Sequence, residues 1–193
     1  MDTSLSSYEM KVVTDAEILL TKNQIIQKVS ALFARLSVEY SEIISSGFLP
    51  ETNLNNAKIS KGENYKGLPY VVLDYPRQFG KVDVFAVRTF FWWGNFFSIT
   101  LQLSGEYRRA HLSTLQQAID KDVFRGWFLG CSDFPWEHHF ESDNYKAIEQ
   151  GNKCSLRHLS VIKIAKKTPL SKWDEVESFL KENFRYLIEV LAN

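Results

Sequence analysis

Two runs rich in aromatic and β-branched residues flank Gly94-Asn95, and this arrangement constrains the fold more than any other feature of the chain. The runs cover residues 82–93 and 96–104. A two-residue loop that begins with glycine is a strong signal for a β-hairpin, because glycine readily takes the positive φ that such a turn requires. The sequence therefore predicts an aromatic antiparallel hairpin near the middle of the chain.

The register of this hairpin decides which side chains share a face. If Trp93 lies opposite Phe96, one face is apolar with a single exception, and it carries Ala86, Arg88, Phe90, Trp92, Phe97, Ile99, Leu101 and Leu103. The other face mixes aromatic rings with hydroxyl and amide groups, and it carries Phe85, Val87, Thr89, Phe91, Trp93, Phe96, Ser98, Thr100, Gln102 and Ser104. We expect helices to cover the apolar face.

Helical periodicity marks both ends of the chain. Apolar residues recur at intervals of three and four over residues 24–44, and a capping box formed by Thr14 and Glu17 starts a helix before them. A second apolar stripe runs over residues 173–191, after a cap at Ser171. These patterns predict a long helix near each terminus.

The patterns between these helices complete the predicted fold. Further strands are expected at residues 70–75, 124–131 and 156–165, a helix within 108–120, and a long polar loop at 48–68. Strands joined by short loops are antiparallel neighbours. The sequence therefore predicts an α+β fold in one domain, residues 1–193. Its antiparallel sheet has four to five strands around the aromatic hairpin, packed by the long N-terminal and C-terminal helices.

Composition excludes several classes of function. The chain has 23 basic and 23 acidic residues, so no net charge attracts it to nucleic acid or to an anionic membrane. No stretch approaches the roughly 18 consecutive apolar residues of a membrane span, and the first residues lack a signal-peptide pattern. Cys131 and Cys154 stand alone, as is usual in a reducing compartment. We expect a cytoplasmic protein without nucleic-acid or membrane partners.

Acidic residues and histidines gather in residues 133–143. The candidates for acid–base chemistry are Asp133, Glu137, His138 and His139. Their spacing matches neither H-E-x-x-H nor another recognised zinc motif, so we expect no metal site, and the sequence indicates no cofactor. If the segment is extended, the two histidines point in opposite directions. The favoured interpretation is that the neighbouring aromatic residues pack inward while the histidines make ordinary hydrogen bonds.

Arg88 is the charged exception on the expected apolar face. A guanidinium keeps its proton and is not buried without a partner. Two explanations remain open: an ion pair with Asp74, Asp83 or an acid from another segment, or a cavity that holds an anionic ligand. We favour the ion pair.

The mixed face of the hairpin is the expected binding surface. An apolar wall with a few polar groups is typical of small-molecule pockets. The expected contact residues are Trp93, Phe91, Phe96, Thr89, Thr100 and Gln102, together with Arg88. We therefore predict a non-enzymatic protein that binds a small molecule or a protein partner.

Two other functions remain open. One is a hydrolytic enzyme, with or without a metal, that uses Asp133, Glu137, His138 and His139. The other is a structural homodimer whose aromatic surface is its own interface.

Three segments of the chain resemble an uncharacterised bacterial protein family. They are residues 61–70 (KGENYKGLPY), 92–96 (WWGNF) and 136–140 (WEHHF). The resemblance covers most of the chain. It implies no activity, so no catalytic residue is carried over from it.

Overall fold

A computed structural model describes residues 3–48, 56–132, 134–150 and 154–192. The helices are α1 (Ser7–Thr14), α2 (Ala16–Ile43), α3 (Gly105–Asp120) and α4 (Val176–Ala192), with a π-helical turn η1 (Ile44–Phe48) and a 3-10 turn η2 (Leu170–Glu175). The strands are β1 (Lys58–Tyr65), β2 (Leu68–Phe79), β3 (Val84–Trp92), β4 (Phe96–Ser104), β5 (Phe128–Gly130), β6 (Tyr145–Ala147) and β7 (Val161–Pro169). The fold is α+β, as the sequence predicts.

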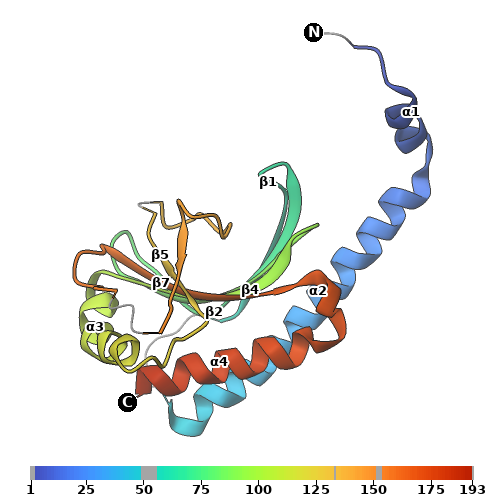
Figure 1. The fold of residues 1–193 in the computed structure, drawn as a ribbon. Helices are drawn as coiled ribbons and strands as arrows, with labels where there is room; N and C mark the ends of the chain where they lie inside the picture. The colour runs from blue at the N-terminus through green and yellow to red at the C-terminus, as the bar shows by residue number, and fades with distance from the viewer. Residues whose placement is uncertain (1–2, 49–55, 133, 151–153, 193) are drawn as a thin grey trace.

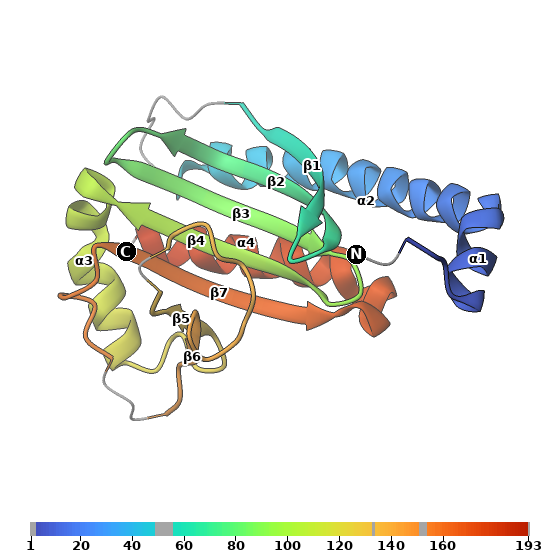
Figure 2. The same ribbon diagram turned by 90° about the horizontal axis from the view of Figure 1, so that it is seen from above.

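The strands form one antiparallel sheet in the order β1-β2-β3-β4-β7-β5-β6. Figure 2 shows β1, β2, β3, β4 and β7 side by side, with the small β5 and β6 at the far edge. The long helices α2 and α4 lie together against one face of the sheet, as Figure 1 shows, and α3 packs near one end. The predicted covering of one sheet face by the N-terminal and C-terminal helices is confirmed.

The sheet has seven strands in the described residues, more than the four to five predicted. The largest addition is β1, which lies in the polar stretch that we expected to be a loop. An edge strand needs only backbone hydrogen bonds to one neighbour, so it tolerates the polar residues that hide it from sequence patterns. The three-residue strand β6 is too short to leave a pattern.

Helix α2 begins at a different cap from the one predicted. Asp15 accepts a hydrogen bond from the backbone N–H of Glu17 at 3.0 Å, whereas Thr14 closes the preceding helix α1. A full capping box does occur, but it lies at Ser6 and Glu9 and starts α1. The expectation at Thr14 was wrong because its hydroxyl donates back to the backbone oxygens of Met10 and Lys11 in α1, at 2.8 and 3.2 Å.

The predicted hairpin register was wrong by one residue. Trp92, not Trp93, lies opposite Phe96, because the turn contains three residues rather than two. Gly94, with φ of +70°, occupies the left-handed conformation in this turn. Since side chains alternate between faces, one additional turn residue moves all of β3 to the opposite face while β4 keeps its expected orientation.

The corrected register gives a face under the helices that is apolar apart from Thr89. It carries Phe85, Val87, Phe91, Phe97, Ile99, Leu101 and Leu103, which all belong to the main hydrophobic core. Thr89 is the polar member of this row, and its hydroxyl is 3.2 Å from that of Tyr40 on α2. The Tyr40 ring in turn stacks on Phe184 of α4, with 3.7 Å between the ring centres.

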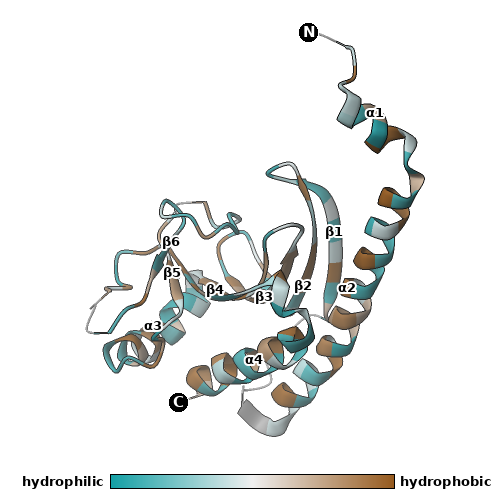
Figure 3. Cartoon of the chain, turned by 45° about the vertical axis from the view of Figure 1, so that its right-hand side comes forward, coloured by the Kyte–Doolittle hydropathy of each residue, from teal (hydrophilic) through white to brown (hydrophobic). Residues whose placement is uncertain are grey.

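Helix α1 extends away from the sheet at the N-terminal end of α2 (Figure 1). It has no buried residue. Hydrophobic and hydrophilic stretches alternate along α2 in Figure 3. Within the described ranges, no helix combines the length and the apolar character needed to cross a membrane.

Candidate functional site

The second face of the sheet is covered by the connection between β5 and β6 instead of by helices (Figure 2). We call residues 134–144 of this connection the covering segment. The loop-covered face beneath it consists of alternate residues of the central hairpin, namely Ala86, Arg88, Phe90, Trp92, Phe96, Ser98, Thr100 and Gln102. Polar and aromatic side chains therefore meet beneath a non-helical cover.

Arg88 and Asp74 form the main ion pair of this face. They lie opposite each other on β3 and β2. The Nε and Nη2 atoms of Arg88 donate to the two oxygens of Asp74 at 2.7 and 2.9 Å. Both side chains are largely buried, so this bidentate geometry compensates for their lost hydration. The favoured explanation of Arg88 is confirmed: its partner is Asp74, although the pair lies on the loop-covered face.

The covering segment completes the surroundings of this arginine. Nη1 of Arg88 donates to Nε2 of His138 at 3.2 Å, and the guanidinium lies 5.2 Å from the centre of the Trp136 ring. Burial lowers the pKa of His138 well below its ordinary value, and the nearby charges of Arg88 and Lys163 lower it further. The lowered pKa keeps the imidazole neutral, and a neutral imidazole can accept the hydrogen bond from Arg88.

Tyr65, at the end of β1, ties the covering segment to the sheet. Its hydroxyl donates a hydrogen bond to Oε2 of Glu137 at 3.0 Å. It also accepts hydrogen bonds from the backbone N–H groups of His138 and His139 at 2.7 and 3.1 Å. Burial raises the pKa of Tyr65 to about 12. One protonated hydroxyl thus satisfies two backbone groups of a segment that lacks regular secondary structure.

Lys163 is a buried cation on β7, with only 2% of its surface exposed. Its Nζ donates to the backbone oxygen of Glu137 at 3.0 Å and to Oδ1 of Asn144 at 2.8 Å, and it lies 4.9 Å from the ring centre of Tyr145. Burial lowers the pKa of Lys163 to about 8. The lysine therefore holds the covering segment at Glu137 and at its last residue, Asn144.

A cleft of about 410 Å³ opens between this face and the covering segment. Its walls combine aromatic rings with positive charges, and they are lined by Lys58, Ser60, Tyr65, Tyr70, Val72, Asp74, Arg77, Phe79, Arg88, Trp136 and His138. Three of these side chains are basic and Asp74 alone is acidic, so the cleft carries a net positive charge. Trp136 is 51% exposed, and its ring centre lies 5.8 Å from that of Phe79 at the edge of the cleft.

The corrected register divides the predicted ligand-binding set. Phe91 and Thr89 belong to the helix-covered face, and Trp93 lies in the hairpin turn, where it packs partly against the main core. The remaining members, Phe96, Thr100, Gln102 and Arg88, share the loop-covered face, but only Arg88 lines the cleft.

The predicted acid–base residues do not form one group. Glu137 and His139 lie together, with Oε2 and Nε2 3.2 Å apart, whereas the His138 ring lies against Phe90 and Arg88. The two histidine side chains therefore lie in different surroundings, as expected for an extended segment. Asp133 lies outside the described residues.

Most residues of the cleft were missed because they belong to β1, β2 and the covering segment. A period of two was the available signal. Tyr70, Val72 and Asp74 alternate on β2, and Trp136 and His138 alternate in the covering segment. Nothing in the sequence shows that these separate alternations meet at one place.

Neither a protein-family model, nor a curated protein sequence, nor a solved structure matches this chain. The chemistry of the cleft therefore follows from its geometry alone.

Proposed function

We propose that the protein binds a small anionic organic molecule in the cleft between the loop-covered face and the covering segment. The observation that carries this proposal is the net positive charge of a cleft with aromatic walls. A ligand of this class places its charged group near the basic side chains and its flat apolar body against the rings.

Arg88 is suited to the charged end of such a ligand. Its ion pair with Asp74 and its contact with His138 hold the guanidinium in place before any ligand arrives. Within the described residues these contacts use three of its N–H groups, and the other N–H groups are left for a ligand oxygen. Preorganisation of this kind lowers the entropy lost on binding.

Lys58 and Arg77 add positive charge to the cleft. Lys58 is exposed on the edge strand β1. Arg77 donates to the backbone oxygen of Asn56 at 2.8 Å and so retains its charge for the cleft. Trp136 and Phe79 offer exposed ring faces beside these cations, which suits an aromatic anion.

The test uses a pair of fluorescent probes that differ in charge. Anilinonaphthalene sulfonate is aromatic and anionic, and phenylnaphthylamine is its uncharged counterpart. We expect saturable binding of the sulfonate and a roughly five- to tenfold loss of its affinity in Trp136→Ala. Lys58→Met should lower the affinity for the sulfonate and leave the affinity for the uncharged probe unchanged, because the two probes differ in charge.

Phe134→Ala is the matched control in the same segment. Phe134 is 73% exposed and does not line the cleft. The proposal fails if Phe134→Ala weakens binding as much as Trp136→Ala, or if neither Trp136→Ala nor Lys58→Met changes the affinity for the sulfonate.

The other functions receive less support from the geometry. An acid–base enzyme would need its groups at one place, and His138 is separated from Glu137 and His139 in the described site. A homodimer through the aromatic face would have to displace the covering segment, which Tyr65 and Lys163 anchor. A cytoplasmic location belongs to the proposal and rests on the two separate cysteines.

A further inference from the structure

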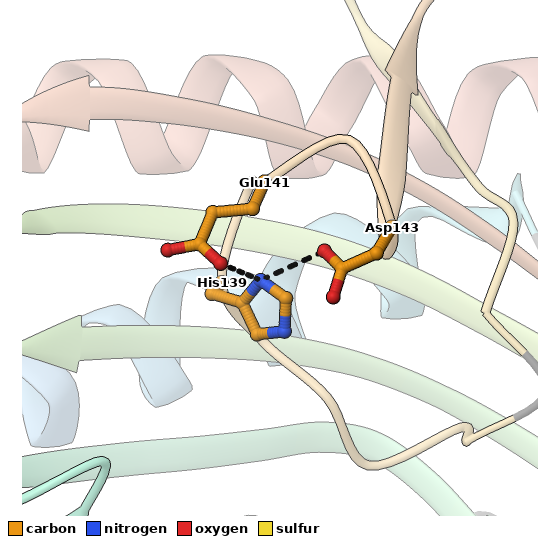
Figure 4. A group of neighbouring side chains, drawn as sticks. All are labelled: His139, Glu141 and Asp143. Atoms are coloured by element: carbon orange, nitrogen blue, oxygen red, sulfur yellow. Dashed lines mark ion pairs between the residues drawn. The ribbon is translucent and has the colours of Figure 1, made fainter.

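Three side chains converge where the covering segment turns toward β6, as Figure 4 shows. Nδ1 of His139 lies 3.7 Å from Oε2 of Glu141 and 3.8 Å from Oδ1 of Asp143. One potential ligand atom from each residue lies within 4.8 Å of the others. Acidic residues on a surface turn are common, so their proximity alone does not indicate an ion.

The state of the His139 ring is the second and independent observation. His139 is 3% exposed, and its Nδ1 atom is buried without a hydrogen-bond partner in the described structure. Nearly all buried polar atoms of proteins have a partner. The orphaned nitrogen faces the two carboxylates, so the missing partner belongs between them.

Glu137 lies at the other ring nitrogen of His139. Its Oε2 atom lies 3.2 Å from Nε2 of the ring, and the hydroxyl of Tyr65 holds the same carboxylate at 3.0 Å. A carboxylate at one ring nitrogen keeps N–H there and leaves a lone pair on the other, which is the usual arrangement of a metal-binding histidine. A lone pair that faces two negative carboxylates is unfavourable unless a proton or a metal cation lies between them, and the experiments below distinguish the two.

We propose that His139, Glu141 and Asp143 bind a divalent first-row transition-metal cation. Imidazole nitrogen suits zinc, iron and related ions, and carboxylate oxygen completes such a site. A bound ion would contact each ligand atom at about 2.0–2.2 Å. Glu141 and Asp143 are 71% and 74% exposed at their side chains, so they are free to close on an ion that the rigid His139 ring positions.

Among the described residues, the only other ion pair of these two carboxylates joins Glu141 to Lys66, and it is weak. Nζ of Lys66 lies 3.8 Å from Oε2 of Glu141, and both groups are well exposed. Exposed pairs of this kind contribute at most about 1 kcal/mol, so a divalent cation displaces the lysine. Bound there, the ion would link positions 139, 141 and 143 and hold the covering segment over the cleft. This site is separate from the proposed anion site, and either proposal can fail alone.

The experiment measures Zn²⁺ binding to the full chain after treatment with a chelator. Isothermal titration calorimetry should show one Zn²⁺ per chain. Loss of an outer-shell partner costs about 10–100-fold in metal affinity, so loss of two direct ligands in E141Q/D143N should cost more than about 100-fold. Both positions are exposed, so the metal-free variant should have the same melting temperature as the metal-free wild type.

The matched control is E106Q/E175Q, which removes two exposed acidic charges elsewhere. It should bind Zn²⁺ like the wild type. Absence of saturable Zn²⁺ binding to the wild type would overturn the proposal. Equal losses of affinity in the two double variants would also overturn it, because a diffuse charge effect would then explain the binding.

Nitrogen NMR of the His139 ring tests the ligand atom directly. We expect Zn²⁺ to change the Nδ1 resonance and to leave Nε2 protonated. A spectrum in which both ring nitrogens stay protonated with Zn²⁺ present would show a simple ion pair with the carboxylates and contradict the proposed site.

Discussion

The two faces of the same sheet are buried by different means. The helix-covered face is a continuous row of aliphatic and aromatic residues, and its polar member Thr89 is paired with Tyr40. The loop-covered face buries an ion pair, a lysine and several hydroxyl and amide groups under a segment without helices. Apolar packing therefore buries one face, and paired polar groups accompany the burial of the other.

The difference follows from what covers each face. Helices satisfy their own backbone groups, so α2 and α4 present mostly apolar side chains to the sheet, with Tyr40 and Asn183 as polar exceptions. The covering segment has few internal backbone hydrogen bonds and must find partners elsewhere. Tyr65 and Lys163 supply such partners. Polar residues of the sheet and its edge therefore hold the covering segment in place.

The largest effect is expected on the helix-covered face. Phe97→Ala removes a fully buried ring that contacts Phe33, Phe91 and Trp173. We expect a loss of about 3–5 kcal/mol in the free energy of unfolding, measured by urea denaturation. Phe134→Ala, at an exposed position, should change it by less than about 0.5 kcal/mol. A small loss for Phe97→Ala would show that this face is not the main core.

The ion pair tests the loop-covered face. Arg88→Met leaves the carboxylate of Asp74 buried without its cation, so we expect a loss of about 3 kcal/mol in unfolding free energy. The double variant Asp74→Asn/Arg88→Met should recover at least half of this loss, because no buried charge remains. A double-mutant cycle measures the coupling, and equal stability of the single and double variants would disprove it.

A smaller effect is expected from the hydroxyl that holds the covering segment. Tyr65→Phe leaves the backbone N–H groups of His138 and His139 without their acceptor, which should cost about 2 kcal/mol. Amide hydrogen exchange should accelerate at these two residues and not in the central strands. Tyr8→Phe, at an exposed position on α1, is the control and should leave both measurements unchanged.

The most specific signal is the pH dependence that Lys163 causes. Burial lowers its pKa from 10.5 to about 8, and the negative charge of Glu137 only partly opposes this shift. Between these values the unfolded chain binds more protons, so the stability contribution of Lys163 rises with pH. The window ends near pH 10, where unfolded tyrosines ionise while burial keeps Tyr65 protonated to about pH 12.

The measurement is the free energy of unfolding from pH 7 to 10 in the wild type and in Lys163→Met. The variant should lose the increase above pH 8. Lys146→Met, at an exposed position on β6, should retain the wild-type slope. An unchanged slope in Lys163→Met would show that the lysine is not desolvated in the folded state.

Sequence patterns could predict the parts of the fold that depend on neighbouring residues. The stripes of α2 and α4 and the alternation in β4 each require only a regular period within one element. The candidate site could not be predicted in this way, because it depends on how separate elements are positioned relative to one another. The three-residue turn at Gly94 moved β3 to the opposite face, and a local pattern cannot count the residues of a turn.

The sequence by itself determined the α+β class and the long helices that cover one face of the sheet. The tertiary structure alone decided that Asp74 is the partner of Arg88, and that a hydroxyl on β1 meets Glu137, 72 residues away. The physical reason is that periodicity records which side of an element is buried, but not which other element buries it. The cleft and the His139 cluster arise from such distant contacts.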